Sequence, residues 1–409
     1  MKLTYLLVVM TLIAVVSDYM LHPFYPQFFQ SRFGVEDPKY VGYYFASICF
    51  MVMLAFPLWA YVSKKIAELN ILIYTQLIAG ILAIACYFST SFASFWVLAL
   101  IMVMFKASYL LVYPFILKTS DENDHGKLIG MLSVVVHMGG ICGAVLGGMV
   151  VDFLRPEHIF LVMASGDFLQ MGVSAWLLKR KYGQSISVGE SNNKPSESKD
   201  SAFLPAYIWR LGLVMFVVYF SEFLSRPFFS MFWESISNFD SKLISGFVYA
   251  VPGFVALATL WYEKKFNVNE KAYVKFIPAV IFGVSGFALQ AAGIEAAVII
   301  GRLMLGWAVF KMDVGLDVML FEQSTPESYS VDYSKVHFFQ NLGVLISSFS
   351  VGLMVDHFGL SVPFQVSLIG FAITFALYYL LLRKYANSVK GQNDLTMESA
   401  NEKLLANEN

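Results

Sequence analysis

Charged residues are scarce in this chain of 409 residues. Lys and Arg number 28 and Asp and Glu number 29, so charged residues make up 14% of the sequence and the net charge is −1. An average soluble domain is about 25% charged. The scarcity of charge excludes an ordinary soluble domain. Nucleic acid is not an expected partner, although the net charge itself carries no information about one.

Cysteine is also scarce, with only Cys49, Cys86 and Cys142 in the chain. All three fall within apolar runs and their number is odd. Both facts argue against a disulfide framework and against a set of metal ligands. No metal and no other cofactor is therefore expected.

Apolar residues, in contrast, make up 58% of the chain. Twelve apolar runs reach or approach the roughly 20 residues that cross a bilayer core. They lie near 3–29, 40–63, 69–89, 92–117, 128–151, 158–178, 205–232, 243–262, 272–293, 296–321, 335–355 and 361–382. The sequence therefore predicts an all-α membrane protein with twelve transmembrane helices.

Positive charge is unevenly divided between the two sets of connecting segments. One set holds only Arg32, Lys39, Arg155 and Lys242, whereas most of the 28 Lys and Arg fall in the other set and in the tails. Positive residues prefer the cytoplasmic side of a membrane protein. We therefore expect a multi-pass protein of the cell (inner) membrane with both termini in the cytoplasm.

The sequence is a tandem repeat of two halves. Residues 16–31, VSDYMLHPFYPQFFQS, align without a gap to residues 220–235, FSEFLSRPFFSMFWES, at an offset of 204. The same offset matches Asp18 with Glu222, His22 with Arg226, Pro23 with Pro227, Gly148 with Gly352 and Asp152 with Asp356. Because each half has six spans, an even number, both halves insert with the same orientation.

The repeat predicts the domain organisation. An N-terminal six-helix bundle at 1–182 is followed by a polar cytoplasmic linker at 183–203. A C-terminal six-helix bundle at 204–385 is followed by a polar cytoplasmic tail at 386–409.

Twelve spans in two parallel six-helix bundles, with cytoplasmic ends and a central linker, resemble the major facilitator superfamily. Residues 130–148, GMLSVVVHMGGICGAVLGG, are similar to the glycine motif of its drug:proton antiporters, with Ala144 in place of a proline. The glycines that fit this motif are Gly130, Gly139, Gly143, Gly147 and Gly148. Small residues on one helix face also allow plain close packing of a neighbouring helix, so packing is the alternative interpretation.

The loop after the second span departs from the superfamily pattern. Residues 57–66, PLWAYVSKKI, keep only the basic pair Lys64 and Lys65 of the usual Gly-x-x-x-Asp-x-x-Gly-Arg-Arg/Lys signature. The resemblance assigns these two lysines to cytoplasmic gating, whereas the missing Asp and Gly indicate a divergent subfamily.

Charges inside the spans need partners, because a charge at the bilayer centre costs roughly 2.5–3.5 kcal/mol. Lys106 lies about twelve residues, roughly 18 Å, from the end of its span, too far for its side chain to reach water. The resemblance implies that Asp18 pairs with Lys106, and that Glu222 pairs with Lys311, which matches Lys106 at an offset of 205. These residues, with His22 and Arg226, form the expected proton-coupling set. Permanent salt bridges that lock helices together are the alternative.

Within this set, Asp18 is the expected proton carrier. His22 follows it by four residues and would tune it, whereas Arg226 has the same spacing from Glu222 and is permanently charged. Further polar and aromatic residues in the spans are candidates for solute binding, namely Phe24, Tyr25, His137, Phe228, Asp313, Asp317, His337, Gln340 and Asn341. Their spacing does not fit a metal site. Asp167 in the sixth span has no assigned role.

These features predict a monomeric secondary transporter that works by alternating access on a small-molecule substrate. The preferred hypothesis is proton-coupled export of a small amphipathic organic molecule, such as a drug-like compound or a secreted siderophore. The alternative is a proton symporter that takes up a polar nutrient. A membrane-embedded enzyme and a transporter-like sensor fit less well, since no nucleophile–base cluster and no added soluble domain are visible. Protons and the lipid bilayer are the other expected partners.

Overall fold

A computed structural model describes residues 2–112, 115–116, 125–180, 206–266, 276–324 and 329–382. The expected linker at 183–203 and tail at 386–409 lie outside these residues. Every regular element in the described part is a helix. We use the terms N-terminal half for residues 2–180 and C-terminal half for residues 206–382.

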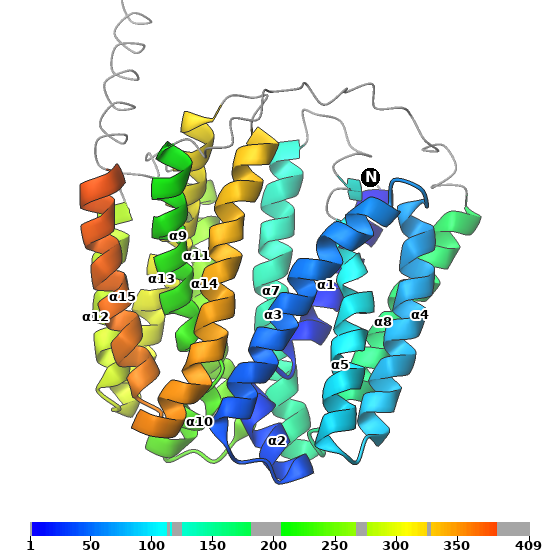
Figure 1. Ribbon diagram of the computed structural model, residues 1–409, viewed down its shortest axis with the longest axis horizontal. Helices are drawn as coiled ribbons and strands as arrows, with labels where there is room; N and C mark the ends of the chain where they lie inside the picture. Colours follow the sequence, from blue (N-terminus) through cyan, green and yellow to red (C-terminus); the bar gives the residue numbers. More distant parts are fainter. Residues whose placement is uncertain are drawn as a thin grey trace, which may run out of the picture.

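The helices stand side by side in one bundle (Figure 1). In the N-terminal half they are α1 (Lys2–Tyr19), η1 (His22–Phe24), α2 (Tyr25–Phe33), α3 (Pro38–Val62), α4 (Glu68–Phe88), α5 (Phe92–Lys106), η2 (Ala107–Leu111), α7 (His125–Phe153) and α8 (His158–Lys179). In the C-terminal half they are α9 (Ala206–Leu224), α10 (Phe229–Ile236), α11 (Lys242–Lys265), α12 (Phe276–Ala291), α13 (Glu295–Gln323), α14 (Tyr329–Phe358), α15 (Val362–Leu377) and η5 (Tyr378–Leu382).

Ten described segments are long and apolar enough to cross a membrane. The remaining two of the expected twelve spans correspond to α12 and α13. The first is a shorter apolar helix of 16 residues, and the second has 29 residues but carries several charges. The side of the bundle on which α1 begins and η5 ends is called the inner side here, and the opposite side the outer side.

The first and seventh spans are broken helices. Helix α1 ends at Tyr19 and the chain resumes as α2 after a short 3₁₀ turn that contains Pro23. Helix α9 ends at Leu224 and α10 begins only after Pro227. Proline has no backbone N–H and its ring clashes with the preceding turn, which explains why both helices stop at the equivalent point of the repeat.

The glycine face of α7 allows α1 to approach its backbone closely. A Cβ atom on Gly143 would lie 2.8 Å from the Val16 carbonyl oxygen, and one on Gly147 would lie 1.8 Å from the Met20 carbonyl oxygen. Gly139 would meet the Val15 side chain at 2.7 Å. This face therefore packs helix against helix within the N-terminal half.

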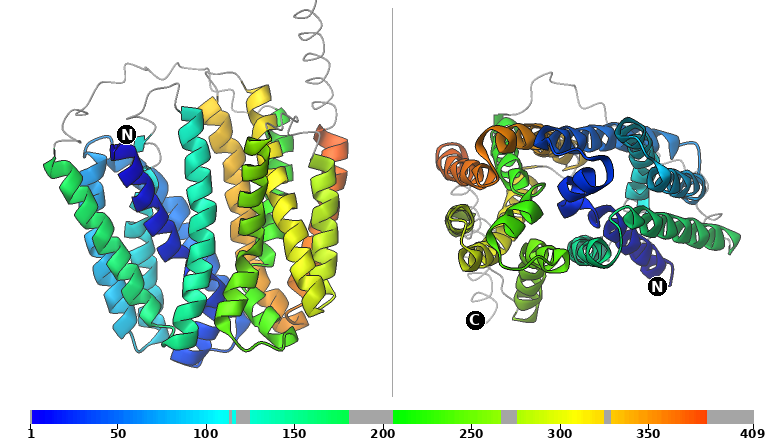
Figure 2. Two further views of the ribbon diagram at one scale, coloured as in Figure 1. Left: turned by 180° about the vertical axis from the view of Figure 1, so that it is seen from behind. Right: turned by 90° about the horizontal axis from the view of Figure 1, so that it is seen from below.

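Two equivalent pairs of helices join the halves, α7 with α11 and α3 with α14 (Figure 2). On the first pair, a Cβ on Gly148 would lie 2.4 Å from the Lys242 carbonyl oxygen. On the second pair, a Cβ on Gly352, the repeat equivalent of Gly148, would lie 2.6 Å from the Pro38 carbonyl oxygen. Both interfaces are thus tight near the outer side.

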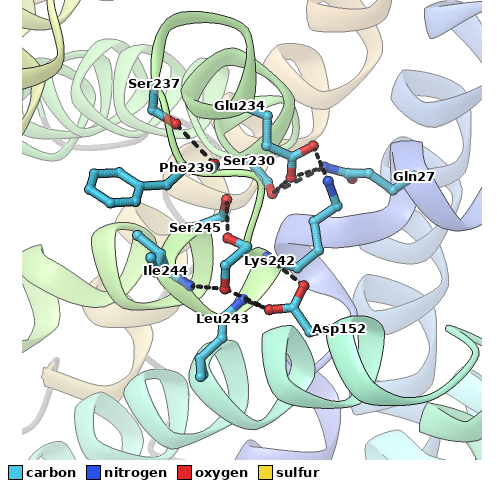
Figure 3. A network of polar contacts seen from close by, with 11 residues as sticks. Gln27, Asp152, Ser230, Glu234, Ser237, Phe239, Lys242, Leu243, Ile244 and Ser245 are labelled. Atoms are coloured by element: carbon cyan, nitrogen blue, oxygen red, sulfur yellow. Dashed lines mark hydrogen bonds and ion pairs between the residues drawn. The ribbon is translucent and has the colours of Figure 1, made fainter.

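Polar contacts across the outer side reinforce the α7–α11 interface (Figure 3). The Asp152 carboxylate at the end of α7 accepts hydrogen bonds from the backbone N–H groups of Lys242 at 2.6 Å and Leu243 at 2.8 Å. It also accepts one from the Ser241 hydroxyl at 2.6 Å. A carboxylate at the N-terminus of α11 satisfies orphan N–H groups and interacts favourably with the helix dipole.

Three further contacts join the halves on this side. The Gln27 amide on α2 donates to the Ser230 hydroxyl at 3.0 Å and to Glu234 at 3.1 Å, and Glu234 forms an ion pair with Lys242 at 2.6 Å. At the other interface, Asp356, the repeat equivalent of Asp152, forms an ion pair with Lys39 at 2.7 Å. Together these contacts hold the outer ends of the two halves against each other.

A Gly147→Ala substitution should destabilise the protein by about 1–3 kcal/mol, because the new methyl group would meet backbone atoms that cannot move aside. The measurement is thermal unfolding of the purified protein. Gly172→Ala on α8 is the control, since nothing lies within 4 Å of its Cβ position. That control should gain about 0.5–1 kcal/mol. A Gly147→Ala variant as stable as wild type would contradict the close approach of α1 and α7.

Reversing the charge of Asp356 should loosen the α3–α14 interface. Asp356→Lys places a like charge beside Lys39 and should therefore raise the population in which the interface is open. Cys49 reports this opening, because its thiol lies at that interface, 3.9 Å from the Ser348 hydroxyl. In a Cys142→Ala background, maleimide labelling of Cys49 should become faster, and adding Lys39→Asp should slow it again. Equal labelling rates in all three proteins would contradict the role of this ion pair.

Candidate functional site

A cavity of about 360 Å³ lies between the two halves. Helices α1 and α7 contribute to it from the N-terminal half, and α9, α11, α13 and α14 from the C-terminal half. Its polar lining consists of Tyr19, His137, Tyr219, Glu222, Ser225, Arg226, Tyr249, Arg302, Asp313 and Gln340. The volume falls within the range of about 300–1,000 Å³ typical of small-molecule sites.

The two arginines of the cavity are held in place by the C-terminal half. Arg226 forms an ion pair with Glu222, and its guanidinium lies 4.0 Å from the centre of the Phe223 ring. Arg302 donates hydrogen bonds to the carbonyl oxygens of Val248 and Tyr249. With Asp313, the cavity lining therefore holds two cationic and two acidic side chains, and their formal charges cancel.

Two acceptor atoms of the cavity residues lack a protein partner. Asp313 Oδ1 and Gln340 Oε1 are buried, and neither has a hydrogen-bond partner among the described residues. Both residues line the cavity. A buried acceptor without a partner is costly, so a ligand or water that donates hydrogen bonds would be favoured here.

A second cluster of charges lies inside the N-terminal half. Lys106 Nζ lies 3.1 Å from Asp18 Oδ1 and 3.4 Å from Asp167 Oδ1. The Lys106 side chain is 4% exposed, that of Asp18 is 29% exposed, and that of Asp167 is 0% exposed. The expected pair of Asp18 with Lys106 is therefore present, and Asp167 on α8 is a second carboxylate partner of Lys106.

Asp167 was left without a role by the sequence, although a signal was available. It lies twelve residues before Lys179, where α8 ends, which corresponds to roughly 18 Å along a helix. Lys106 is expected at the same depth in its own span. Matching depths of opposite charges on different spans would have identified the contact. The cavity residues Tyr19, Tyr219 and Arg302 were likewise not assigned from the sequence.

The expected pair of Glu222 with Lys311 is wrong. Lys311 forms an ion pair with Glu263 on α11, and Glu222 pairs with Arg226 on its own segment. The repeat explains the difference. The offset of 204 that matches Asp18 with Glu222 matches Lys106 with Phe310, which lines the cavity, so Lys311 is turned by about 100° around α13.

His22 does not lie beside Asp18. Helix α1 ends at Tyr19, so His22 lies beyond the helix that carries Asp18. The His22 ring instead stacks on the Tyr19 ring at 5.1 Å and meets the Phe45 ring edge-on at 5.0 Å. No ion pair between His22 and Asp18 is present in the described part of the chain, so the expected tuning of Asp18 by His22 is not supported by this geometry.

The aromatic candidates lie in the core and not in the cavity. Phe24 is 0%, Tyr25 5% and Phe228 3% exposed, and all three belong to one buried apolar cluster that contains residues of both halves. The Tyr25 ring packs against the Tyr44 ring of α3 at 4.8 Å. Their large apolar surface stabilises the fold.

The remaining candidates are divided. His137, Asp313 and Gln340 line the cavity, whereas Asp317, His337 and Asn341 do not. Asp317 lies 3.7 Å from His337, and the Asn341 amide donates to the His337 carbonyl oxygen.

The residues assigned to gating and packing lie away from the cavity. Lys64 and Lys65 are exposed at the inner end of α3, and their gating role stays a prediction. Gly130 lies in α7, but its surroundings are outside the part that the structure describes. Among the described residues, no group of three or more His, Cys, Asp or Glu is arranged to hold a metal ion.

Comparison with known proteins identifies the family of the chain. The family model of the Major Facilitator Superfamily matches residues 7–280. No curated protein matches the chain by sequence. Among solved structures, a mutant form of the nucleoside transporter NupG is similar with a TM-score of 0.76 and 10% identity, over 93% of this chain and 100% of that one.

Two further structures share the fold. A bacterial homologue of the human lysosomal transporter Spinster, in an inward-facing and occupied conformation, has a TM-score of 0.71 and 13% identity, over 93% of this chain and 96% of that one. The D-xylose–proton symporter has a TM-score of 0.70 and 13% identity, over 93% and 97%. The family match covers more than half of the chain, and the twelve-span helical fold agrees with it. This chain is a transporter that belongs to the Major Facilitator Superfamily.

Proposed function

We propose that the protein is a proton symporter for a small, uncharged, polar solute that carries hydrogen-bond donors. Two features support the proposal. The cavity is electrically balanced and holds two acceptor atoms that lack a protein partner. A separate cluster of Lys106 with carboxylates is buried in the N-terminal half. The cavity supplies solute binding and the cluster supplies proton coupling.

The charge balance of the cavity favours an uncharged solute. A cation or anion in the cavity would carry an unmatched charge into a space whose two arginines already have partners. Asp313 and Gln340 accept hydrogen bonds from solute hydroxyl or amine groups, and the rings of Tyr19, Tyr219, Phe223, Tyr249 and Phe310 provide flat apolar surface. This combination suits a nucleoside or a monosaccharide.

The similar structures support this solute class. One is named as a nucleoside transporter and another as a D-xylose–proton symporter. At such low sequence identity the similarity shows only a shared fold, so the choice of solute is based on the cavity itself.

The buried cluster supports proton coupling. Asp18 pairs with Lys106, and the next residue, Tyr19, lines the solute cavity. Any movement of Tyr19 on solute binding displaces Asp18 as well, because both lie at the broken end of α1. Displacement of Asp18 changes the charge beside Lys106 and with it the proton affinity of the buried cluster, which links the proton to the solute.

Export was the preferred hypothesis because of the glycine pattern in the fifth span. Those glycines contact α1 and α11 at backbone distance, so close packing accounts for them. The pattern therefore carries no information about the direction of transport, and the polar cavity favours uptake of a polar nutrient.

Proteoliposomes that are one pH unit more alkaline inside should accumulate labelled uridine or xylose up to about tenfold, since one pH unit is worth about 1.4 kcal/mol for one proton. Asp18→Asn should abolish accumulation but retain exchange of labelled for unlabelled solute, because exchange moves no net proton. The proposal fails if wild type accumulates neither probe nor any other nucleoside or monosaccharide of a panel. Accumulation driven only by an inside-acid gradient would establish export.

Gln340→Leu should weaken solute binding by about 1–3 kcal/mol, a factor of roughly 5 to 150, because it removes an acceptor from the cavity. The measurement is the solute concentration that half-saturates exchange. Asn341→Leu is the matched control, since the neighbouring side chain does not line the cavity, and it should leave this concentration unchanged. An unchanged value for Gln340→Leu would remove Gln340 from the solute site.

A further inference from the structure

A row of buried polar side chains follows one face of α8. Asp167, Gln170 and Ser174 are spaced by three and four residues and are 0%, 1% and 0% exposed. Helix α8 packs against α4, where Gln76 is also 0% exposed. The solute cavity is not lined by any of these residues.

Several polar atoms in this row have no protein partner. Asp167 Oδ2, Gln170 Nε2, Ser174 Oγ and Gln76 Oε1 lack a hydrogen bond among the described residues. Asp167 does lie within ion-pair distance of Lys106. Buried polar atoms are normally bonded to protein or to ordered water, and several such atoms close together favour bound water.

The row leads from the charged cluster towards the inner side. Helix α8 runs from the outer side to the inner side, so Gln170 and Ser174 follow Asp167 in that direction. Seven residues from Asp167 to Ser174 correspond to roughly 10 Å along the helix axis, and Lys179 at the helix end lies roughly 8 Å further on.

The C-terminal half has no equivalent row. At the offset of 204, Phe371 takes the place of Asp167, and it is 0% exposed and packs against Phe287 at 5.0 Å. Thr374 takes the place of Gln170, and its hydroxyl donates to the Gly370 carbonyl oxygen at 3.0 Å. At these two described positions the repeat builds the same helix contact with a packed ring and a hydrogen-bonded hydroxyl, so packing alone does not require the polar side chains of Asp167 and Gln170.

The charges around Asp167 leave an excess of one negative charge. Lys106 is the ammonium of the cluster, and Asp18 and Asp167 are its two carboxylates. The other titratable groups that face the cluster in the described part of the chain are Tyr19, Tyr25 and Tyr109, which are neutral phenols at ordinary pH. Helix α4 faces the cluster with Gln76. An unmatched carboxylate in a buried site is expensive, and binding one proton removes the excess charge.

We propose that Asp167 is the proton-binding carboxyl group of this transporter, and that Gln170, Ser174 and Gln76 hold a file of water molecules that carries the proton between Asp167 and the inner side. The proton path thus runs through the interior of the N-terminal half and bypasses the solute cavity. This inference deepens the proposed proton coupling and rests on it. Asp18, whose side chain is 29% exposed, links the cluster to the cavity region through Tyr19.

Infrared spectroscopy of the purified protein tests the proton site without any solute. A pH titration should show the C=O band of a protonated carboxyl that disappears as the pH rises. Asp167→Asn should remove that band, and Asp167→Glu should restore one at a shifted frequency. Thr374→Val, at the equivalent place of the other half, should leave the band unchanged. The same titrating band in wild type and in Asp167→Asn would overturn the assignment.

A pH jump followed by time-resolved infrared spectroscopy tests the path. Gln170→Leu combined with Ser174→Ala should slow loss of the Asp167 proton at least about tenfold, whereas Thr374→Val should leave the rate unchanged. An unchanged rate in the double variant would overturn the path. These outcomes are separable from failure of the proposed function, in which the Asp167 band titrates but no pH gradient drives solute accumulation.

Discussion

Burying an ammonium group among apolar helices requires carboxylates to neutralise it, and the N-terminal half is organised around that requirement. Lys106 lies too deep to reach water, so three helices bring their polar groups to one point. Asp18 comes from the broken end of α1 and Asp167 from α8. One ammonium for two carboxylates gives the cluster a place for a proton, which a simple salt bridge does not have.

The two halves share a fold but differ in chemistry. Both have a span that breaks at a proline, and both pack glycines against backbone near the outer side. The C-terminal half, however, has Phe371 where the N-terminal half has Asp167, and it supplies most of the cavity lining. In the proposed mechanism, duplication provides the symmetry needed for alternating access, and divergence separates proton binding from solute binding. Asp18 and Tyr19, adjacent on α1, are where the two functions meet.

Features fixed by periodicity and repetition could be predicted from the sequence. The apolar runs predicted the membrane spans, and the alignment that matches Asp18 with Glu222 predicted the two halves. The cost of a buried charge indicated that Lys106 needs a partner, and the resemblance to the superfamily implied that this partner is Asp18. Side-chain direction could not be predicted in the same way. A single residue of offset turned Lys311 towards Glu263, and the break after Tyr19 separated His22 from Asp18. Contacts such as that of Lys106 with Asp167 depend on which helices are neighbours, and the neighbours are known only from the folded structure.

Lys106 is charged and offsets one of the two negative charges of Asp18 and Asp167, which leaves a place for one proton. Chemical unfolding of the purified protein measures this most directly. Lys106→Met should lower the free energy of unfolding by about 3–5 kcal/mol, because it leaves buried acids without their cation. Adding Asp18→Asn and Asp167→Asn to that variant should recover most of the loss. A Lys106→Met variant as stable as wild type, or a triple variant no more stable than Lys106→Met alone, would contradict the account.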